Sequence, residues 1–459
     1  MLKVLGVVAV AMVFSTEGSV ASSAARTARS TAVRVSAAGV DIASLLSSAR
    51  GASPIICSLA AQSVRGWGWG GSNDAPVTPL PKVTDITNRD FESADLSAVD
   101  ISLLLSSLST DDDCVREMAV RLVARKNNPV IASGLIERLG APQPALRAVA
   151  AFGLGLATQR ESLDPLIRTL RDTDEGVRAN AAWALGRLDN GRALQPLLGL
   201  VSDKAEIVRL ASVAAIGRLD SVNAGATLIR VLREDQSPAV RRTAAWALGH
   251  LESRDAVQAL SATLQRDSDA RVREMSAWAL GSIEARSASA ALLAAARRDA
   301  DEAVRETSAW ALGRLEDAGV LDALSQVAAT DRSARVRGTA AWSIGQLGDG
   351  EHRVPAPLLQ LLRDGDDDAR LKAAWAISQI GDSAAIPAVK AALKVERNET
   401  INKALTRALV RSGESSAAVF SELLDSKDPN VREAAVRGLA GRRSFNPWPW
   451  PWPRPRPFP

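Results

Sequence analysis

Residues 301–315, DEAVRETSAWALGRL, recur with variations along most of this 459-residue chain. From Trp246 to Trp375, the Trp residues of successive copies are 32, 32, 32 and 33 residues apart. One copy, IVRLASVAAIGRL, has Ala214 in the Trp position. A fixed period of this length indicates an array of stacked structural repeats. The copies with Trp surround Trp183, Trp246, Trp278, Trp310, Trp342 and Trp375.

Each copy reads as an amphipathic helix. At about 100° per residue, Val177, Ala181 and Leu185 fall on one face and Trp183 falls on the opposite face. Asp and Ser residues just upstream suit helix N-caps. A second apolar segment, such as residues 192–201 or 255–265, separates the copies. The pattern predicts an all-α fold, an α-solenoid of two-helix repeats. Eleven second helices are expected to begin near Asp112, Gln143, Asp174, Ala205, Ser237, Asp269, Asp301, Ser333, Asp366, Glu399 and Asp428.

The VR pair, the AAWALG core and the Asp-rich turn before them resemble HEAT repeats of the short type found in phycobilisome-lyase-like proteins. The match covers roughly residues 100–441. The resemblance implies a right-handed superhelix of about eleven two-helix repeats, with the second helix of each pair lining the concave surface. It also implies an alternative function, that of an accessory subunit of a bilin-lyase-type enzyme.

Composition divides the chain into five parts. Residues 1–21 are expected to be a signal peptide, residues 22–65 a small helical region and residues 66–94 a Gly/Pro-rich linker. The repeat array follows over residues 95–441, and residues 442–459 form a Pro/Trp/Arg-rich tail expected to be disordered. Both ends are basic, with +3 over residues 1–90 and +4 over residues 442–459, so the stretch between them, which contains the array, carries −3 of the formal net charge of +4. A nearly neutral array argues against nucleic-acid binding.

The N-terminus predicts export to the periplasm or the medium. Lys3 precedes an apolar run over residues 4–14, and small residues follow at 19–21. An organelle transit peptide is the alternative, because Arg26, Arg29 and Arg34 lie in an acid-free Ala/Ser-rich stretch. The two cysteines, Cys57 and Cys114, are either paired or free thiols, and their spacing leaves both states open.

The sequence predicts no active site, no cofactor and no metal site. The chain has two His residues, His250 and His352, and it lacks a nucleophile elbow, a phosphate-binding Gly loop and a metal-ligand spacing. The Arg of each VR pair is expected to reach turn Asp residues of its own or the next repeat, fixing the stacking register. We therefore expect a non-enzymatic protein.

The Trp row is the main candidate for function, with two interpretations left open. Each Trp either covers small Ala and Gly surface or contributes to a groove for an extended peptide, since Trp and Arg are favoured in binding hot spots. The candidate partner-binding residues are Trp183, Trp246, Trp278, Trp310, Trp342, Trp375, Arg187, Arg242, His250 and Arg314.

The tail offers a second candidate surface. Its aromatic and basic residues suit weak contact with a membrane interface, docking into a Trp-lined groove, or simple exposure to solvent. The expected partner is a protein or peptide of unknown identity, not a nucleic acid, bound by a monomer. The tail residues in question are Trp448, Trp450, Trp452, Arg454 and Arg456.

Overall fold

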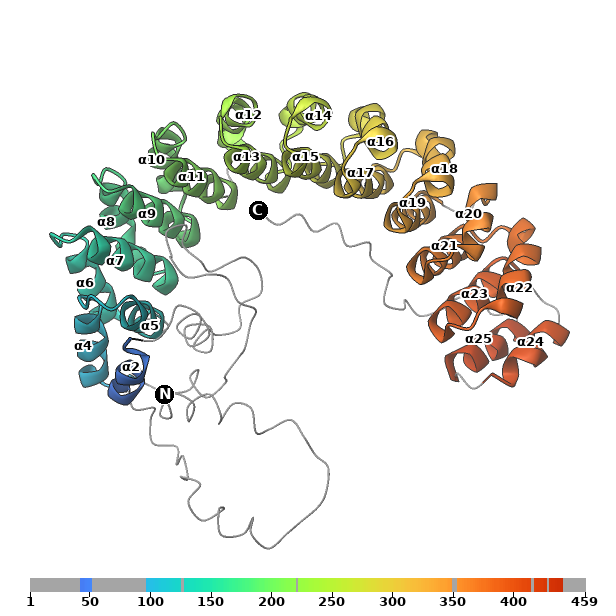
Figure 1. Cartoon of the computed structure of the whole chain (residues 1–459), viewed down its shortest axis with the longest axis horizontal. Coiled ribbons are helices and arrows are strands. Elements are labelled where there is room, and N and C mark those ends of the chain that lie inside the picture. The colour runs from blue at the N-terminus through green and yellow to red at the C-terminus, as the bar shows by residue number, and fades with distance from the viewer. Residues whose placement is uncertain are drawn as a thin grey trace, which may run out of the picture. The chain divides into compact units, whose positions relative to one another are not determined.

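The computed structural model describes residues 42–51, 96–124, 128–219, 222–348, 353–413, 417–426 and 429–440. Every regular element in these ranges is a helix, which makes the fold an all-α solenoid (Figure 1). The chain divides into two units, residues 1–215 and 216–459, and the boundary falls inside helix α11 (Glu206–Arg218). The predicted signal peptide, most of the linker and the tail lie outside the described residues, as does His352.

The first described helix of the N-terminal unit is α2 (Ile42–Ala49), which lies within the region 22–65 that precedes the array. Four two-helix repeats follow, the last of them completed by α11. The first helices are α4 (Ala98–Ser107), α6 (Pro129–Arg138), α8 (Leu163–Thr169) and α10 (Leu194–Leu200). The second helices before α11 are α5 (Asp113–Val123), α7 (Pro144–Ala157) and α9 (Glu175–Leu188).

The C-terminal unit continues the same alternation, with first helices in one layer and second helices in another (Figure 1). The first helices are α12 (Gly225–Glu234), α14 (Val257–Arg266), α16 (Ser289–Arg298), α18 (Leu321–Thr330), α20 (Ala356–Gln360), α22 (Ile386–Val395) and α24 (Ala417–Leu424). The second helices are α13 (Pro238–His250), α15 (Ala270–Ser282), α17 (Glu302–Arg314), α19 (Ala334–Leu347), α21 (Asp367–Ile380), α23 (Glu399–Arg411) and α25 (Pro429–Leu439).

The eleven second helices begin where the repeat pattern predicts. Asp112, Asp174, Asp269, Asp301 and Asp366 are N-caps whose carboxylates accept hydrogen bonds from backbone N–H groups of the first turn. Helix α23 begins at the predicted Glu399, and Asn398 is its N-cap.

The first helices differ from the prediction at their N-terminal ends. The segments predicted over residues 192–201 and 255–265 each begin with a short 3-10 turn, η5 (Gly191–Ala193) and η7 (Arg254–Ala256). The same device precedes most first helices, as η4 (Arg160–Ser162), η6 (Val222–Ala224), η8 (Arg286–Ala288), η9 (Ala318–Val320) and η11 (Ser383–Ala385), whereas η10 (Leu361–Arg363) follows α20. Such turns connect helices with i→i+3 hydrogen bonds where the chain must bend.

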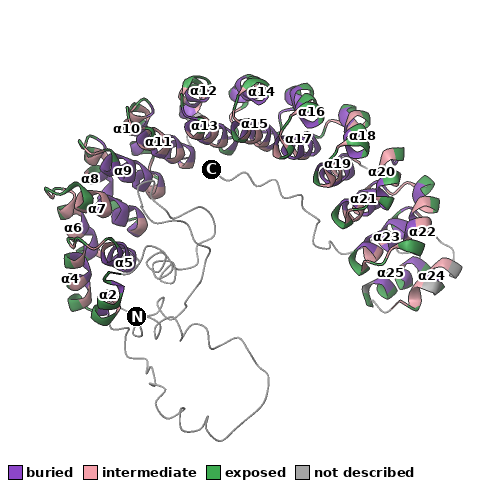
Figure 2. Ribbon diagram, viewed as in Figure 1, coloured by how far each residue is buried: buried purple, intermediate pink, exposed green. Residues whose placement is uncertain are grey.

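The core of each unit runs along the helix surfaces that face neighbouring helices (Figure 2). Leu and Val from both helices of a repeat are buried, and Ala and Gly let neighbouring second helices approach closely. A Cβ atom on Gly186, for example, would lie 2.7 Å from the Cα atom of Ala215 in the next second helix. Within the described ranges, no helix is both long enough and apolar enough to cross a bilayer.

Candidate partner-binding surface

A ladder of buried ion pairs joins consecutive repeats within each unit. In seven repeats, the Arg at the VR position binds a carboxylate of the next repeat, in the turn before that repeat's second helix. Both its Nε and an NH2 group take part, and the Nε–carboxylate distances are 2.7–2.9 Å. The pairs are Arg147–Asp172, Arg178–Asp203, Arg241–Asp267, Arg273–Asp299, Arg305–Asp331, Arg337–Asp364 and Arg370–Glu396. The structural interpretation of these Arg residues is therefore confirmed.

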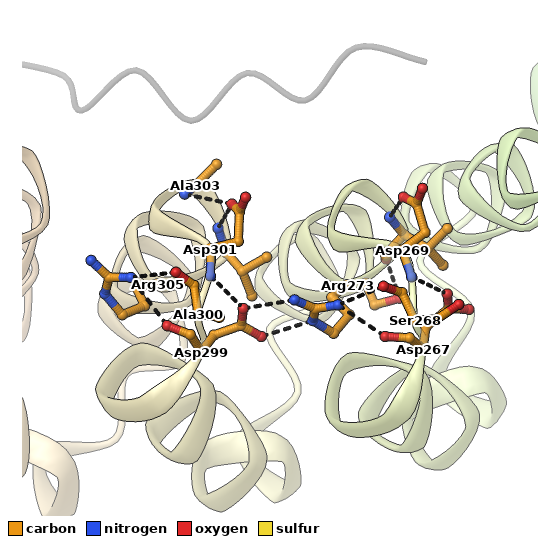
Figure 3. Close-up of polar contacts among 12 residues, drawn as sticks. Asp267, Ser268, Asp269, Arg273, Asp299, Ala300, Asp301, Ala303 and Arg305 are labelled. Atoms are coloured by element: carbon orange, nitrogen blue, oxygen red, sulfur yellow. Dashed lines mark hydrogen bonds and ion pairs between the residues drawn. The ribbon is translucent and has the colours of Figure 1, made fainter.

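The Arg of each ion pair also donates to backbone carbonyls of the turn that precedes its own helix, as Figure 3 shows for two adjacent repeats. Arg273 donates from its remaining NH group to the backbone carbonyls of Asp267 and Ser268, six and five residues earlier. The Asp299 carboxylate that holds Arg273 also accepts from the backbone N–H of Asp301. Carboxylate and carbonyl groups of one turn thus bind arginines of two successive repeats.

The electrostatics of the ladder follow from these contacts. The hydrogen bonds from Arg147 lower the pKa of Asp172 against the opposing effect of burial. Burial acts to raise the pKa of Asp299, but the bonds from Arg273 and from the backbone of Asp301 outweigh it and the pKa is lowered. These carboxylates are charged at neutral pH. Because arginines of the protein already neutralise them, the ladder does not present free charges to a ligand.

A pocket of about 560 Å³ lies beside the Arg305–Asp331 ion pair, between the ends of α16 and α18. Its arginines are largely engaged, because Arg297 donates to Gln326 and Arg332 donates to the carbonyl of Ala300. The pocket is therefore a by-product of the ladder, and we do not assign a ligand to it.

The Trp residues pack edge-on against the preceding repeat. A Cβ atom on Gly249 would lie 2.9 Å from Cζ3 of Trp278, and one on Gly281 would lie 2.9 Å from Cζ3 of Trp310. The same notch receives Trp183 at Gly155, Trp246 at Gly217 and Trp375 at Gly345. Part of the Trp row is therefore structural cover, as one of the two sequence interpretations proposed.

Burial divides the row. Trp183 is 8% exposed and Trp342 is fully buried at 0%. Trp183 contacts Phe152, with ring centroids 5.1 Å apart, and Trp342 is stacked with Trp375 at 6.1 Å. Trp183 and Trp342 therefore offer little ring surface to the peptide groove that was the other interpretation left open by the sequence. The half-buried members, which retain exposed ring surface, are Trp246, Trp278, Trp310 and Trp375.

We use the name Trp face for a surface on the second helices α11 to α21 of the C-terminal unit. It consists of these four Trp residues and of the residues one turn before and one turn after the Trp position in each helix. His250, one turn after Trp246, is exposed and stacks on its ring at 5.3 Å. Arg314, at the same position after Trp310, pairs with Glu284. In the N-terminal unit, Arg187 takes this position, lies over the Trp183 ring at 5.4 Å and donates to the carbonyl of Gly155.

Arg218, which sequence reasoning did not select, holds this position on α11. It is half-buried, and it makes no hydrogen bond or ion pair with any described residue. Burial lowers the pKa of its guanidinium. The signal in the sequence was Ala214, because the Trp that would lie one turn earlier in this helix is missing.

Charged residues also occupy the position one turn before three of the six Trp residues, as Arg242, Glu274 and Glu306. Glu306 is 3% exposed, accepts a hydrogen bond from Thr339 and pairs with Arg335. Glu274, at the equivalent place one repeat earlier, is half-buried and makes no ion pair within the described part of the chain. The predicted site residue Arg242 precedes it by one repeat, and its Nε is buried without a hydrogen bond.

Glu274 has an unusual electrostatic environment. Burial, Asp301 and Glu306 raise its pKa, while Thr307 and Arg242 lower it to a smaller extent. The site therefore favours a neutral carboxyl group or an added positive charge.

The described residues settle little about metals, cysteines and the tail. The described residues contain no group of His, Cys, Asp and Glu side chains arranged to hold a metal ion. Cys114 on α5 is disulfide-bonded, and the chain's other cysteine, Cys57, lies outside the described residues. The tail residues Trp448, Trp450, Trp452, Arg454 and Arg456 lie outside them as well.

Comparison with protein families finds one family along the array. The family model for HEAT repeats matches residues 132–217, 225–305, 289–370 and 355–440. No characterised protein sequence matches the chain.

Solved structures support the same fold. Importin beta is 16% identical, with a TM-score of 0.56 over 74% of this chain and 58% of importin beta. Kap95p bound to RanGDP is also 16% identical, with a TM-score of 0.53 over 74% of this chain and 57% of Kap95p. This chain thus spans little more than half of either protein. The CpcE–CpcF phycocyanin lyase of Nostoc sp. is 20% identical over 50% of this chain and 91% of the lyase chain, and its TM-score of 0.33 carries no argument about activity.

Proposed function

This chain belongs to the HEAT-repeat family, and from that premise we propose that it is a non-enzymatic scaffold that binds a protein or an extended peptide along its Trp face. HEAT-repeat solenoids are typically protein-interaction scaffolds, because stacked repeats create long continuous surfaces. The fold alone does not identify a partner, so the proposal depends on the surface.

The observation that carries the proposal is the partial exposure of Trp246, Trp278, Trp310 and Trp375. Each ring is fixed at one edge by a glycine notch, so little conformational entropy is lost when a ligand contacts the other part. Rigid aromatic side chains flanked by polar groups are typical of binding hot spots.

The related fold of Kap95p supports this reading by analogy. Kap95p has been solved bound to RanGDP and in a complex with Nup1, and the second of these structures matches this chain with a TM-score of 0.50. Those partners are properties of Kap95p, and the analogy extends only to the use of a HEAT array for binding proteins.

Two pairs of added lysines test the surface without removing any Trp from its notch. The Trp-face variant carries Ser282→Lys and Gln346→Lys, at half-buried positions one turn after Trp278 and Trp342. The control carries Gln265→Lys and Ala294→Lys, at exposed positions on the first helices α14 and α16. Both raise the net charge equally.

We expect affinity capture from native extract to recover a partner with the wild-type chain and with the control, and to lose it with the Trp-face variant. Equal capture by both variants would contradict the proposal. Circular dichroism on both variants checks that the helices remain folded.

We further propose that the protein is exported. Disulfides persist in oxidising compartments and are rare in reducing ones, so the bonded state of Cys114 supports this location. The mature native protein is then expected to begin near residue 22 after cleavage. N-terminal sequencing that finds Met1 at the start of the mature chain would contradict export by a cleaved signal.

A further inference from the structure

Two charged groups that make no ion pair with a described residue lie on the Trp face of the C-terminal unit, and Thr307 and Arg242 only partly offset the burial of the second of them. One is the guanidinium of Arg218 on α11, and the other is the carboxyl group of Glu274 on α15. Half-buried charges without partners are unfavourable, so their presence at a surface calls for an explanation.

The contrast is clearest for Glu274. Its equivalent one repeat later, Glu306, receives Arg335 from the next second helix, 29 residues along the chain. The residue 29 positions after Glu274 is Ala303, which has no charge to offer. Glu274 therefore has no equivalent of the Arg335 that pairs with Glu306, and its carboxyl group is open to an external cation.

Arg218 shows the same kind of loss. Other basic residues at this position have internal partners: His250 has the Trp246 ring, Arg314 has Glu284, and Arg411 donates to the carbonyl of Ser378. Arg218 follows Ala214 in the Trp position and has neither a ring nor an acceptor among the described residues. Its guanidinium is open to an external anion.

We propose that Arg218 and Glu274 are paired anchors for one extended peptide, binding an acidic and a basic side chain of the same ligand. This inference rests on the function proposed above and specifies the partner's chemistry. Charge complementarity is the argument, because Arg218 lacks the carboxylate that Arg314 has and Glu274 lacks the guanidinium that Glu306 has.

The fold sets the spacing of the two ligand charges. The anchors are two second helices apart, at about 9 Å per helix, and eight residues apart along the repeat register, at about 1.5 Å each. They are therefore separated by about 22 Å. An extended proline-rich peptide covers this distance in about seven residues, at about 3.1 Å each.

The chain's own tail is a poorer candidate for this role. Residues 442–459 contain four Arg and no Asp or Glu, so they could offer a cation to Glu274 but no acidic side chain to Arg218. The proposed ligand is therefore a separate peptide that carries both charges.

The experiment restores an internal partner instead of removing a group. Ala303→Arg should give Glu274 the ion pair that Glu306 already has, and so compete with the ligand. The matched control is Ala239→Arg, at the same register position on α13. The residue 29 positions earlier is Leu210, so the new Arg has no carboxylate to pair with at that position. The probes are labelled proline-rich peptides of about twelve residues, carrying one Glu and one Arg about seven residues apart in either order. Reference peptides carry the charges about three residues apart, or none.

We expect the full-length chain to bind one charge order with about tenfold or greater preference over both reference peptides. Ala303→Arg should weaken that binding by about tenfold or more without lowering the melting temperature, whereas Ala239→Arg should leave binding unchanged. Arg218→Glu should also weaken it, and a peptide with Arg in place of Glu should restore it.

Three results would overturn the inference: no preference for the charged peptides, an unchanged affinity in Ala303→Arg, or no rescue of Arg218→Glu by the altered peptide. If partner capture is lost with the Trp-face lysines but Ala303→Arg has no effect, the scaffold function stands and the paired anchors do not. If neither change has an effect, both proposals fall.

Discussion

The Arg–Asp ladder and the Trp face are two rows of the same repeat motif, and they treat their polar groups in opposite ways. Along the ladder, each paired guanidinium has a carboxylate of the next repeat and a carbonyl of its own turn. On the Trp face, equivalent positions differ from repeat to repeat, and Arg218 and Glu274 make no ion pair with a described residue, whereas Arg314 and Glu306 do. The ladder, in which each paired Arg has protein partners, holds the repeats in register. We expect a partner to bind on the Trp face, where charged groups lack the ion pairs found in neighbouring repeats.

The ladder should be the most sensitive part of the structure. Arg178→Leu leaves the buried carboxylate of Asp203 without its cation and frees the carbonyls of Asp172 and Thr173. We expect a loss of about 3–5 kcal/mol in the free energy of unfolding, measured with urea. Arg192→Leu, which breaks the exposed pair with Asp164 in the same unit, should cost less than about 1 kcal/mol. Equal losses would remove the distinction between ladder and surface.

The glycine notches come next. A Cβ on Gly155 would lie 2.6 Å from the Trp183 ring and 2.8 Å from the Cα of Ala184, so Gly155→Ala should destabilise the N-terminal unit by about 1–3 kcal/mol. Gly199→Ala on α10 is the control, since its Cβ would meet nothing within 4 Å and Ala is the better helix former. We expect thermal unfolding to show opposite signs for the two substitutions. A stabilised Gly155→Ala would mean that the Trp edge does not fill the notch.

Acid should weaken the ladder selectively. The folded pKa of Asp203 is lowered, with burial opposing and the Arg178 bonds favouring the charged form. A lowered folded pKa contributes stability that is present above the ordinary pKa of about 3.9 and is lost as pH falls through the folded value. The stability gap between wild type and Arg178→Leu should therefore shrink below about pH 4. A gap that stays constant from pH 7 to pH 3 would contradict a charge-based contact.

Glu274 should give the smallest effect, with the opposite sign. Its folded pKa is raised, so the charged form is disfavoured in the folded chain and stability falls as pH rises above its ordinary value. Glu274→Gln should stabilise the protein at pH 7, by on the order of 0.5 kcal/mol, and change nothing near pH 3. Glu306→Gln should destabilise it, because Glu306 has Arg335 and Thr339 as partners. Chemical denaturation of both variants at the two pH values checks this contrast.

Much of the fold could be read from the periodicity of one sequence. The starts of the second helices and the structural role of the ladder Arg residues followed from spacing and capping chemistry. The helical wheel placed each Trp opposite the core face but could not show the contact with the next helix. That contact depends on the Gly three residues after the Trp of the preceding repeat, as in Gly249 with Trp278.

The candidate site was harder to predict, because it depends on ion-pair partners that one repeat has and its neighbour lacks. Trp342 and Trp310 hold the same position in the repeat, yet stacking with Trp375 accompanies burial of the first, and the second stays half-exposed. Glu274 looks like Glu306 until Ala303 is compared with Arg335 across a gap of 29 residues. Comparison of equivalent positions in neighbouring repeats would have revealed both open charges, once the structure had shown which offsets bring side chains together.

The central claim is that partners bind the Trp face, and site-specific photo-crosslinking tests it most directly. A photoreactive residue at Ser282 on the Trp face is compared with one at Gln265 on the first helix α14, in the full-length chain and in native extract. We expect a crosslinked partner from Ser282 and none from Gln265. A partner crosslinked from Gln265 alone, or equally from both positions, would contradict binding along the Trp face.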